Sequence, residues 1–161
     1  MNLIARLLPP SNIVLDCEVS SKKRMFEQVG LLFETNQGIA RSLVFDSLFA
    51  RERLGSTGLG QGLAIPHGRI KGLHDAAGAF LRLKAPVPFE APDGRPVDLV
   101  FVLLVPEQAT EQHLEILSEL AQMFSDRELR QRLATAADTG TIHQHITAWQ
   151  PYVADQRRAA V

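Results

Sequence analysis

Apolar residues recur every three or four positions in two segments early in the chain, a spacing typical of amphipathic helices. The first segment begins after Ser20 or Ser21, either of which suits a helix N-cap, and runs to about Thr35, where Asn36-Gln37-Gly38 ends it. The second runs from about residue 40 to 53. The residues predicted to face the core are Met25, Phe26, Val29, Leu32, Phe33, Val44, Phe45, Leu48 and Phe49.

A nearly continuous apolar run at 97–105 predicts a different element, a central strand that is covered on both faces. Shorter strands are expected at 13–15, 63–65 and 78–83, and a turn at 92–95. Helical spacing returns afterwards, and helices are expected at about 111–124, after Asp126, and from Thr139 or Thr141 to about 149.

Helices therefore both precede and follow the predicted strands. The fold class that packs such elements economically is α/β, as a three-layer α/β/α sandwich with a mixed β-sheet. The sequence shows no internal repeat and no linker-like segment. We therefore expect residues 1–161 to form a single domain with a core at about 10–150.

The composition argues against several classes of partner. With 17 basic and 18 acidic residues and no run of like charges, the chain is not expected to bind nucleic acid or an anionic membrane. No segment approaches the roughly 20 apolar residues of a membrane span, and Arg6 interrupts the N-terminal apolar stretch. The single cysteine, Cys17, cannot form an intramolecular disulfide, which fits a cytoplasmic location.

A window rich in glycine ends in a constrained histidine. Five of the eleven glycines fall between residues 55 and 68, and bare amide groups there can approach an anion closely. Pro66 restricts the backbone before His67, and Gly68 is expected to permit a sharp turn after it. We therefore predict phosphate chemistry at His67, beside a phosphate-binding loop that contains Ser56, Thr57, Gly58, Gly60 and Gly62.

Other chemistry fits this window less well. Gly55 and Gly60 have the spacing of an ATP-binding P-loop, but Gln61 stands where that motif needs lysine. A helix precedes the glycines where a dinucleotide fingerprint needs a strand. Ser56 lacks the Gly-x-Ser-x-Gly setting of a hydrolase nucleophile. His143 and His145 are two positions apart on a predicted helix and so face different ways, which argues against a metal pair.

Two further residues can stabilise a bound phosphate. His113 lies in the first turn of a predicted helix, where free amide groups and the helix dipole favour an anion. Arg51 lies four residues before Gly55 and can turn its guanidinium towards the loop. An ordinary solvated helix end is an equally good interpretation of Arg51 from spacing alone.

The same segments resemble a known family. The motifs are Ala50-Arg51-Glu52, Gly62-Leu63-Ala64-Ile65-Pro66-His67-Gly68-Arg69, Val97-Asp98-Leu99-Val100-Phe101 and His113-Leu114-Glu115-Ile116-Leu117. Together they resemble the mannitol/fructose-type enzyme IIA of the bacterial phosphotransferase system. The nitrogen-regulatory branch of that family fits best, and the likeness runs from about residue 10 to 150.

The resemblance implies a role for each site residue. His67 would accept a phosphoryl group, as a tele-phosphohistidine, from the phosphohistidine of an HPr-type carrier protein. His113 would match the second active-site histidine of the family, and Arg51 its active-site arginine. The family also implies an α/β/α fold with a mixed sheet, no metal and no tightly held cofactor.

Regulation is the function that we expect. The sequence contains no sugar-phosphorylating IIB domain and no membrane IIC domain, and the stretches Ala91–Asp98 and Leu103–Pro106 look like the nitrogen-type branch. The expected output is binding to regulatory target proteins that depends on phosphorylation. Two alternatives stay open: a sugar-specific enzyme IIA that passes phosphate to a IIB domain, and a non-catalytic binding module in which phosphorylation is vestigial.

Overall fold

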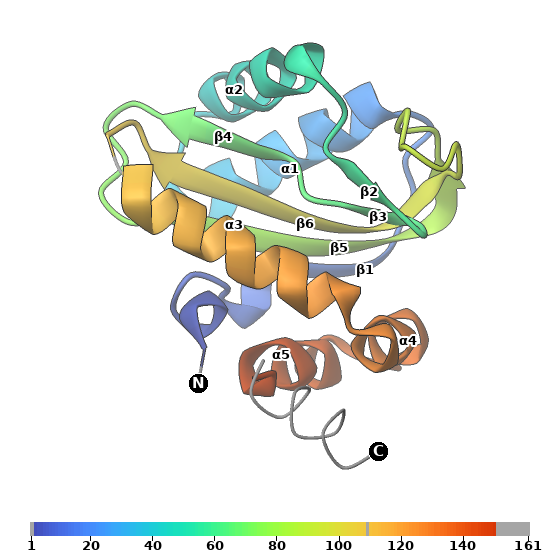
Figure 1. Ribbon diagram of the computed structural model, residues 1–161. Helices are drawn as coiled ribbons and strands as arrows, with labels where there is room; N and C mark the ends of the chain where they lie inside the picture. The colour runs from blue at the N-terminus through green and yellow to red at the C-terminus, as the bar shows by residue number, and fades with distance from the viewer. Residues whose placement is uncertain (1, 109, 151–161) are drawn as a thin grey trace.

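A mixed β-sheet lies between two layers of helices (Figure 1). The structure is a computed structural model that describes residues 2–108 and 110–150. Its strands are β1 (Ile13–Cys17), β2 (Gly58–Gly60), β3 (Leu63–Ala64), β4 (His67–Ile70), β5 (Ala77–Val87) and β6 (Val97–Pro106). Its helices are α1 (Lys22–Gln37), α2 (Arg41–Leu54), α3 (Thr110–Ser125), α4 (Arg127–Thr135) and α5 (Thr139–Ala148), with short 3-10 helices η1 (Leu3–Arg6) and η2 (Pro10–Asn12).

Strand β6 organises the sheet. The strand order is β1-β5-β6-β3-β2, and β4 also pairs with β6. Strands β3 and β4 both run parallel to β6, whereas β5 runs antiparallel to it. Strand β6 therefore has neighbours on both sides, as the apolar run in the sequence predicts.

Each face of the sheet has its own hydrophobic core. Helices α1 and α2 cover one face, and α3, α4, α5 and η1 cover the other. Side chains of β6 alternate between the two cores, so that Leu103 packs on the α3 side and Leu104 on the α1 side. Both leucines are fully buried. The predicted α/β/α sandwich with a mixed sheet is confirmed.

The ends of α1 follow from its sequence. The Ser21 hydroxyl accepts a hydrogen bond from the Arg24 amide at 3.1 Å, which satisfies a free N–H of the first turn. Gly38 follows the helix in the left-handed conformation, with φ of 71°. Both helix signals in the sequence are therefore confirmed.

The glycine-rich window differs from the open loop that we expected. Gly58–Gly60 and Leu63–Ala64 pair as an antiparallel hairpin, with its turn at Gln61 and Gly62. His67 opens strand β4 instead of standing in a turn. Gly68 continues that strand, and a β-carbon built on it would lie 2.2 Å from the Ser47 hydroxyl of α2. Gly68 is thus required for close packing between β4 and α2, and the expectation of a sharp exit was wrong.

Within the described ranges, every helix falls short of the length and apolar character that a membrane crossing requires.

Candidate functional site

His67 is placed by the junction between two short strands. Both β3 and β4 pair with β6, and Pro66 separates them because proline has no N–H to donate to the sheet. The Pro66 carbonyl still accepts from the Leu103 amide at 2.9 Å, so the backbone stays attached to β6. His67 pairs with Leu103 in register and is half-buried. Its ring is therefore carried on a fixed part of the sheet.

The two ring nitrogens of His67 have different partners. Nδ1 lies 2.9 Å from the Ile65 carbonyl oxygen. A carbonyl only accepts, so Nδ1 carries the proton and donates it. Arg51 Nε donates to Nε2 at 3.2 Å, which requires that Nε2 present its lone pair. The neutral ring thus offers Nε2 as its nucleophilic atom.

Arg51 reaches His67 from the last turn of α2. Its Nη1 donates to the Gly55 carbonyl at 2.9 Å while Nε faces the histidine ring. The side chain is half-buried and lies in contact with the predicted site. This geometry distinguishes Arg51 from Arg53, which is exposed two positions further along the helix.

His113 meets His67 from the other helical layer. It lies in the first turn of α3, and the centroids of the two rings are 5.7 Å apart with an interplanar angle of 86°. Among the described residues, the buried His113 Nδ1 has no hydrogen-bond partner. The structure therefore brings His67, His113 and Arg51 together, and it leaves one ring nitrogen of His113 without a partner among the described residues.

The surroundings favour neutral rings at both histidines. Burial lowers the pKa of His67, and the nearby Arg51 charge adds to the effect, while the Ile65 carbonyl and the Glu52 carboxylate oppose it. Burial also lowers the pKa of His113, with smaller contributions from His67 and Arg69. A neutral imidazole is the form that can attack phosphorus, so the site keeps His67 competent at neutral pH.

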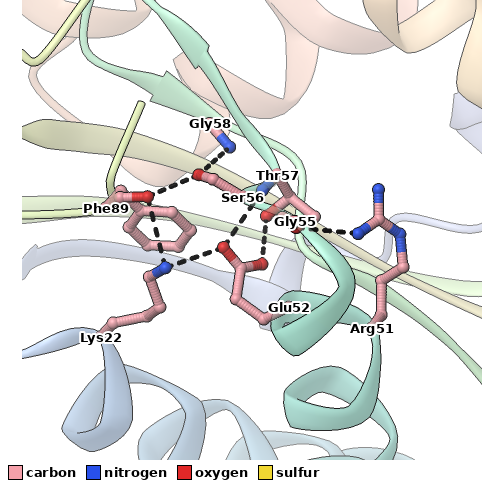
Figure 2. Close-up of polar contacts among 8 residues, drawn as sticks. All are labelled: Lys22, Arg51, Glu52, Gly55, Ser56, Thr57, Gly58 and Phe89. Carbon is pink, nitrogen blue, oxygen red and sulfur yellow. Dashed lines mark hydrogen bonds and ion pairs between the residues drawn. The ribbon is translucent and has the colours of Figure 1, made fainter. Parts of the chain in front are cut away.

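The segment that leads into the glycine hairpin binds a carboxylate that belongs to the protein. The Thr57 amide and hydroxyl donate to the Glu52 carboxylate at 3.1 and 2.7 Å. The Gly58 amide donates to the Ser56 hydroxyl at 3.1 Å, and that hydroxyl donates to the Phe89 carbonyl (Figure 2). Gly60 and Gly62 lie at the end of β2 and in the hairpin turn, both with positive φ. A phosphate-binding role for Ser56, Thr57, Gly58, Gly60 and Gly62 stays a prediction.

Sequence reasoning missed Glu52. Its side chain is only 4% exposed and pairs with Lys22 of α1 at 2.8 Å, although it lies in the last turn of α2 between two arginines. The spacing of residues along α2 indicates that Glu52 lies on its buried face. Val44, Leu48 and Glu52 are four residues apart and occupy one helix face, and Val44 and Leu48 are buried.

The remaining histidines show no catalytic grouping. The His143 ring lies 3.1 Å from the Leu8 carbonyl through Nε2, a contact that ties α5 to the segment after η1. His74 is exposed. Within residues 2–108 and 110–150, no group of three or more His, Cys, Asp and Glu side chains could hold a metal ion.

Comparison with known proteins adds three similarities. A nitrogen regulatory protein of Pseudomonas aeruginosa is 44% identical over 150 residues, which cover 89% of this chain and 94% of the relative. The crystal structure of nitrogen regulatory protein IIA-Ntr from Neisseria meningitidis superposes with a TM-score of 0.85 at 55% identity, covering 89% of this chain and 99% of that one. Enzyme IIAMTL of Escherichia coli, in its complex with phosphorylated enzyme IIBMTL, shares the fold at a TM-score of 0.75 and 19% identity, covering 89% of this chain and 100% of that chain.

A family model also matches residues 6–149, which is most of the chain. The resemblance to the nitrogen-regulatory branch of enzyme IIA is thereby confirmed. The chain belongs to the family described as phosphoenolpyruvate-dependent sugar phosphotransferase system, EIIA 2.

Proposed function

We propose that this phosphotransferase-system protein accepts a phosphoryl group on Nε2 of His67 from the phosphohistidine of an HPr-type donor. In this proposal residues 1–161 act as one domain, and the phosphorylated and free forms bind regulatory target proteins differently. The names of the similar proteins, nitrogen regulatory proteins in two bacteria, support regulation as the output. The lone Cys17 is in keeping with a reducing compartment, and we propose a cytoplasmic location.

One observation carries the proposal: the two hydrogen bonds that distinguish the nitrogens of His67. The Ile65 carbonyl holds the proton on Nδ1 at 2.9 Å, and the lone pair of Nε2 faces Arg51 Nε at 3.2 Å. A half-buried histidine with one directed lone pair and an adjacent guanidinium suits transfer of an anionic group. This arrangement supports the tele isomer of phosphohistidine as the product.

The transfer step balances without a metal or a base. The Nε2 lone pair forms a bond to phosphorus while the bond between phosphorus and the donor's ring nitrogen breaks, and that nitrogen keeps the electron pair. Nδ1 retains its proton, so the His67 ring gains a positive charge. The Ile65 carbonyl, which accepts from Nδ1, stabilises this charge, in line with its effect of raising the pKa of His67.

Arg51 and His113 provide charge stabilisation in this proposal. Arg51 Nε now donates to the atom that would bind phosphorus, so its guanidinium would pass to the phosphoryl oxygens as the new bond forms. The ring of His113, whose centroid lies 5.7 Å from that of His67, can donate to a second oxygen. The hairpin amides of Thr57 and Gly58 would first have to leave Glu52 and Ser56.

The first prediction tests this assignment. With a phosphorylated HPr-type donor, the wild-type protein should gain an adduct that is labile in acid and stable in alkali, as expected for phosphohistidine. His67→Ala should accept no phosphate because the nucleophile is gone, whereas His74→Ala, which alters an exposed histidine, should behave as wild type. Phosphate uptake by His67→Ala at the normal rate would refute the proposal.

A second experiment separates regulation from sugar transport. The family description includes sugar phosphotransfer, so a sugar-specific carrier is the second candidate function. Labelled phosphoprotein should be offered to a panel of IIB domains, and both forms should be tested for binding to candidate regulatory targets. Rapid transfer to a sugar IIB, without any binding that depends on phosphorylation, would favour the second candidate. Failure of the wild type to accept phosphate at all would leave only a binding module.

A further inference from the structure

A buried ion pair lies directly behind the candidate site. Glu52 follows Arg51 in α2, and its carboxylate accepts from Lys22 Nζ of α1 at 2.8 Å (Figure 2). The two side chains are 4% and 16% exposed, respectively. Burying such a pair carries a desolvation cost that its attraction often only offsets. The pair is therefore poorly explained by stability alone.

The pair is the centre of a network that holds residues 55–58. Besides Lys22, Glu52 binds both the amide and the hydroxyl of Thr57. Lys22 Nζ also donates to the Phe89 carbonyl at 3.3 Å and lies 4.5 Å from the centre of the Phe89 ring. The same carbonyl accepts from the Ser56 hydroxyl. The segment between α2 and β2 is thus held from α1, from α2 and from Phe89.

This segment contains the carbonyl that orients Arg51. Gly55 lies between Glu52 and Thr57 in the chain, and its oxygen accepts from Arg51 Nη1 at 2.9 Å (Figure 2). The same guanidinium then presents Nε to His67 Nε2. A continuous series of contacts therefore runs from the buried carboxylate to the nucleophilic nitrogen.

We propose that Glu52 is a positioning residue, which holds Thr57 and Lys22 so that the Gly55 carbonyl directs the Arg51 guanidinium at His67. The inference rests on the proposed role of His67 and extends it to a residue that does not touch the phosphoryl group. A leucine at position 52 would complete the apolar helix face with Val44 and Leu48. Leucine, however, cannot accept a hydrogen bond from the Thr57 amide, so the side chain at position 52 would no longer hold residues 55–58 in place.

The sign of a pKa change distinguishes positioning from a simple charge effect. Arg51 lowers the pKa of His67, and Glu52 raises it by a smaller amount. If Glu52→Gln only removed a negative charge, the pKa of His67 would fall. If it also released Arg51 from His67, the larger Arg51 effect would be lost and the pKa would rise. We expect a rise, measured by NMR titration of the His67 ring in the full-length protein.

Glu52→Asp separates the two effects again. Aspartate keeps the negative charge but is one methylene shorter, so it cannot reach Thr57 and Lys22 at their present distances. Positioning predicts a rise in the pKa of His67 for this variant also, whereas a pure charge effect predicts no change. A rise in both variants supports the proposal, and any other pattern overturns it.

Transfer kinetics provide a second measurement. Removing one stabilising donor typically slows a reaction about 10²–10³-fold, and we expect part of that loss in Glu52→Gln. In an Arg51→Gln background the same change should slow transfer no further, because Arg51 is the residue through which Glu52 acts. The proposal would be contradicted if Glu52→Gln slowed transfer in the Arg51→Gln background by the same factor as in the wild type.

Glu34→Gln is the matched control. Glu34 also joins α1 to α2, through Arg41 at 2.7 Å, but Arg41 begins α2 whereas Arg51 lies in the last turn of that helix. It should leave both the pKa of His67 and the transfer rate unchanged. The NMR titration requires no donor, so it tests Glu52 even if wild-type protein accepts no phosphate and the proposed function fails.

Discussion

At the scale of single residues, the candidate site orients the Nε2 lone pair of His67 and places Arg51 and His113 beside the ring. The ring of His113 packs against His67, and its buried Nδ1 has no partner within residues 2–108 and 110–150. An unsatisfied buried polar atom costs free energy until it gains a partner. A phosphoryl oxygen on His67 would supply that partner. His113 therefore has a physical reason to favour the phosphorylated state over the free one.

His113→Ala should slow phosphoryl transfer to His67 without abolishing it. Loss of one such donor typically costs about 10²–10³ in rate, or roughly 3–4 kcal/mol in the barrier. His113→Gln, which retains an N–H donor, should recover part of the rate. Rapid-quench transfer from a labelled donor would measure these rates, and an unchanged rate in His113→Ala would remove His113 from the mechanism.

The pH dependence of transfer follows from the lowered pKa of His67. Protonated imidazole has no lone pair on Nε2, so the rate should fall as pH decreases through the pKa of His67. Because burial lowers that pKa, the acid limb should lie below the ordinary histidine value of about 6.5. Arg51→Gln should move the limb to higher pH. A limb at or above 6.5 in the wild type would contradict the described surroundings of the ring.

The same shift affects folding with a defined sign. The unfolded chain binds a proton at His67 more readily than the folded protein, so folding stability rises with pH in this range. The contribution of His67 is fully present above about pH 6.5 and is lost as pH falls from there towards the lower pKa of the folded state.

Residues that belong to a recognisable motif were predictable, and residues that act through tertiary contacts were not. His67, His113 and Arg51 came from sequence blocks and lie together in the structure. Glu52 was missed because charge at a helix end suggests solvent, and its partner Lys22 lies on another helix. Nothing local in the sequence shows that the Thr57 amide donates to the Glu52 carboxylate.

At the scale of elements, long and strongly patterned segments were predicted well, whereas the short strands β2 and β4 were not. Strand β6 and helix α1 match their predicted spans closely. Strands β2 and β4 have three and four residues, which is too few for an alternating pattern to appear. Their existence depends on pairing with β3 and β6, which a local pattern cannot reveal.

The contact between β4 and α2 yields a prediction at Gly68. An added β-carbon would lie 2.2 Å from the Ser47 hydroxyl and 3.1 Å from the Ser47 backbone carbon. We expect Gly68→Ala to lower the free energy of unfolding by about 1–3 kcal/mol. It should also slow transfer, because β4 carries His67.

Two variants control for this prediction. Ser47→Ala combined with Gly68→Ala should recover part of the stability, because the hydroxyl makes the shortest contact. Gly140→Ala, whose nearest neighbour would be the Asp138 carboxylate at 3.6 Å, should cost no stability. Urea denaturation would measure all three, and a fully stable Gly68→Ala would show that β4 and α2 can move apart freely.

At the scale of the whole molecule, the β-sheet separates two hydrophobic cores and contributes side chains to both. The α/β/α architecture was predictable because helices flank an apolar central strand in the sequence. Which helices cover which face was not predictable, since that depends on how the chain crosses the sheet. The structure places α1 and α2 on one face and the later helices on the other.

Because one sheet contributes side chains to both cores, we expect the two cores to unfold together. Leu103→Ala and Leu104→Ala enlarge opposite cores, and each should cost about 2–5 kcal/mol. The only tryptophan, Trp149, packs in the core that contains Leu103. Its fluorescence should nevertheless report the same denaturation midpoint as circular dichroism in Leu104→Ala. Separate midpoints would show that the two sides unfold independently.

The hydrogen bond between His67 Nδ1 and the Ile65 carbonyl affects how the site responds to mutation. The group that holds the proton on Nδ1 belongs to the main chain, and every amino acid encoded at position 65 supplies that carbonyl. A codon change there alters packing and leaves the carbonyl in place. In the proposed mechanism, the protonation of Nδ1 is therefore less sensitive to point mutation than the contributions of Arg51 and His113. If His67 is phosphorylated as we propose, point mutations should slow the reaction before they change which isomer of phosphohistidine forms.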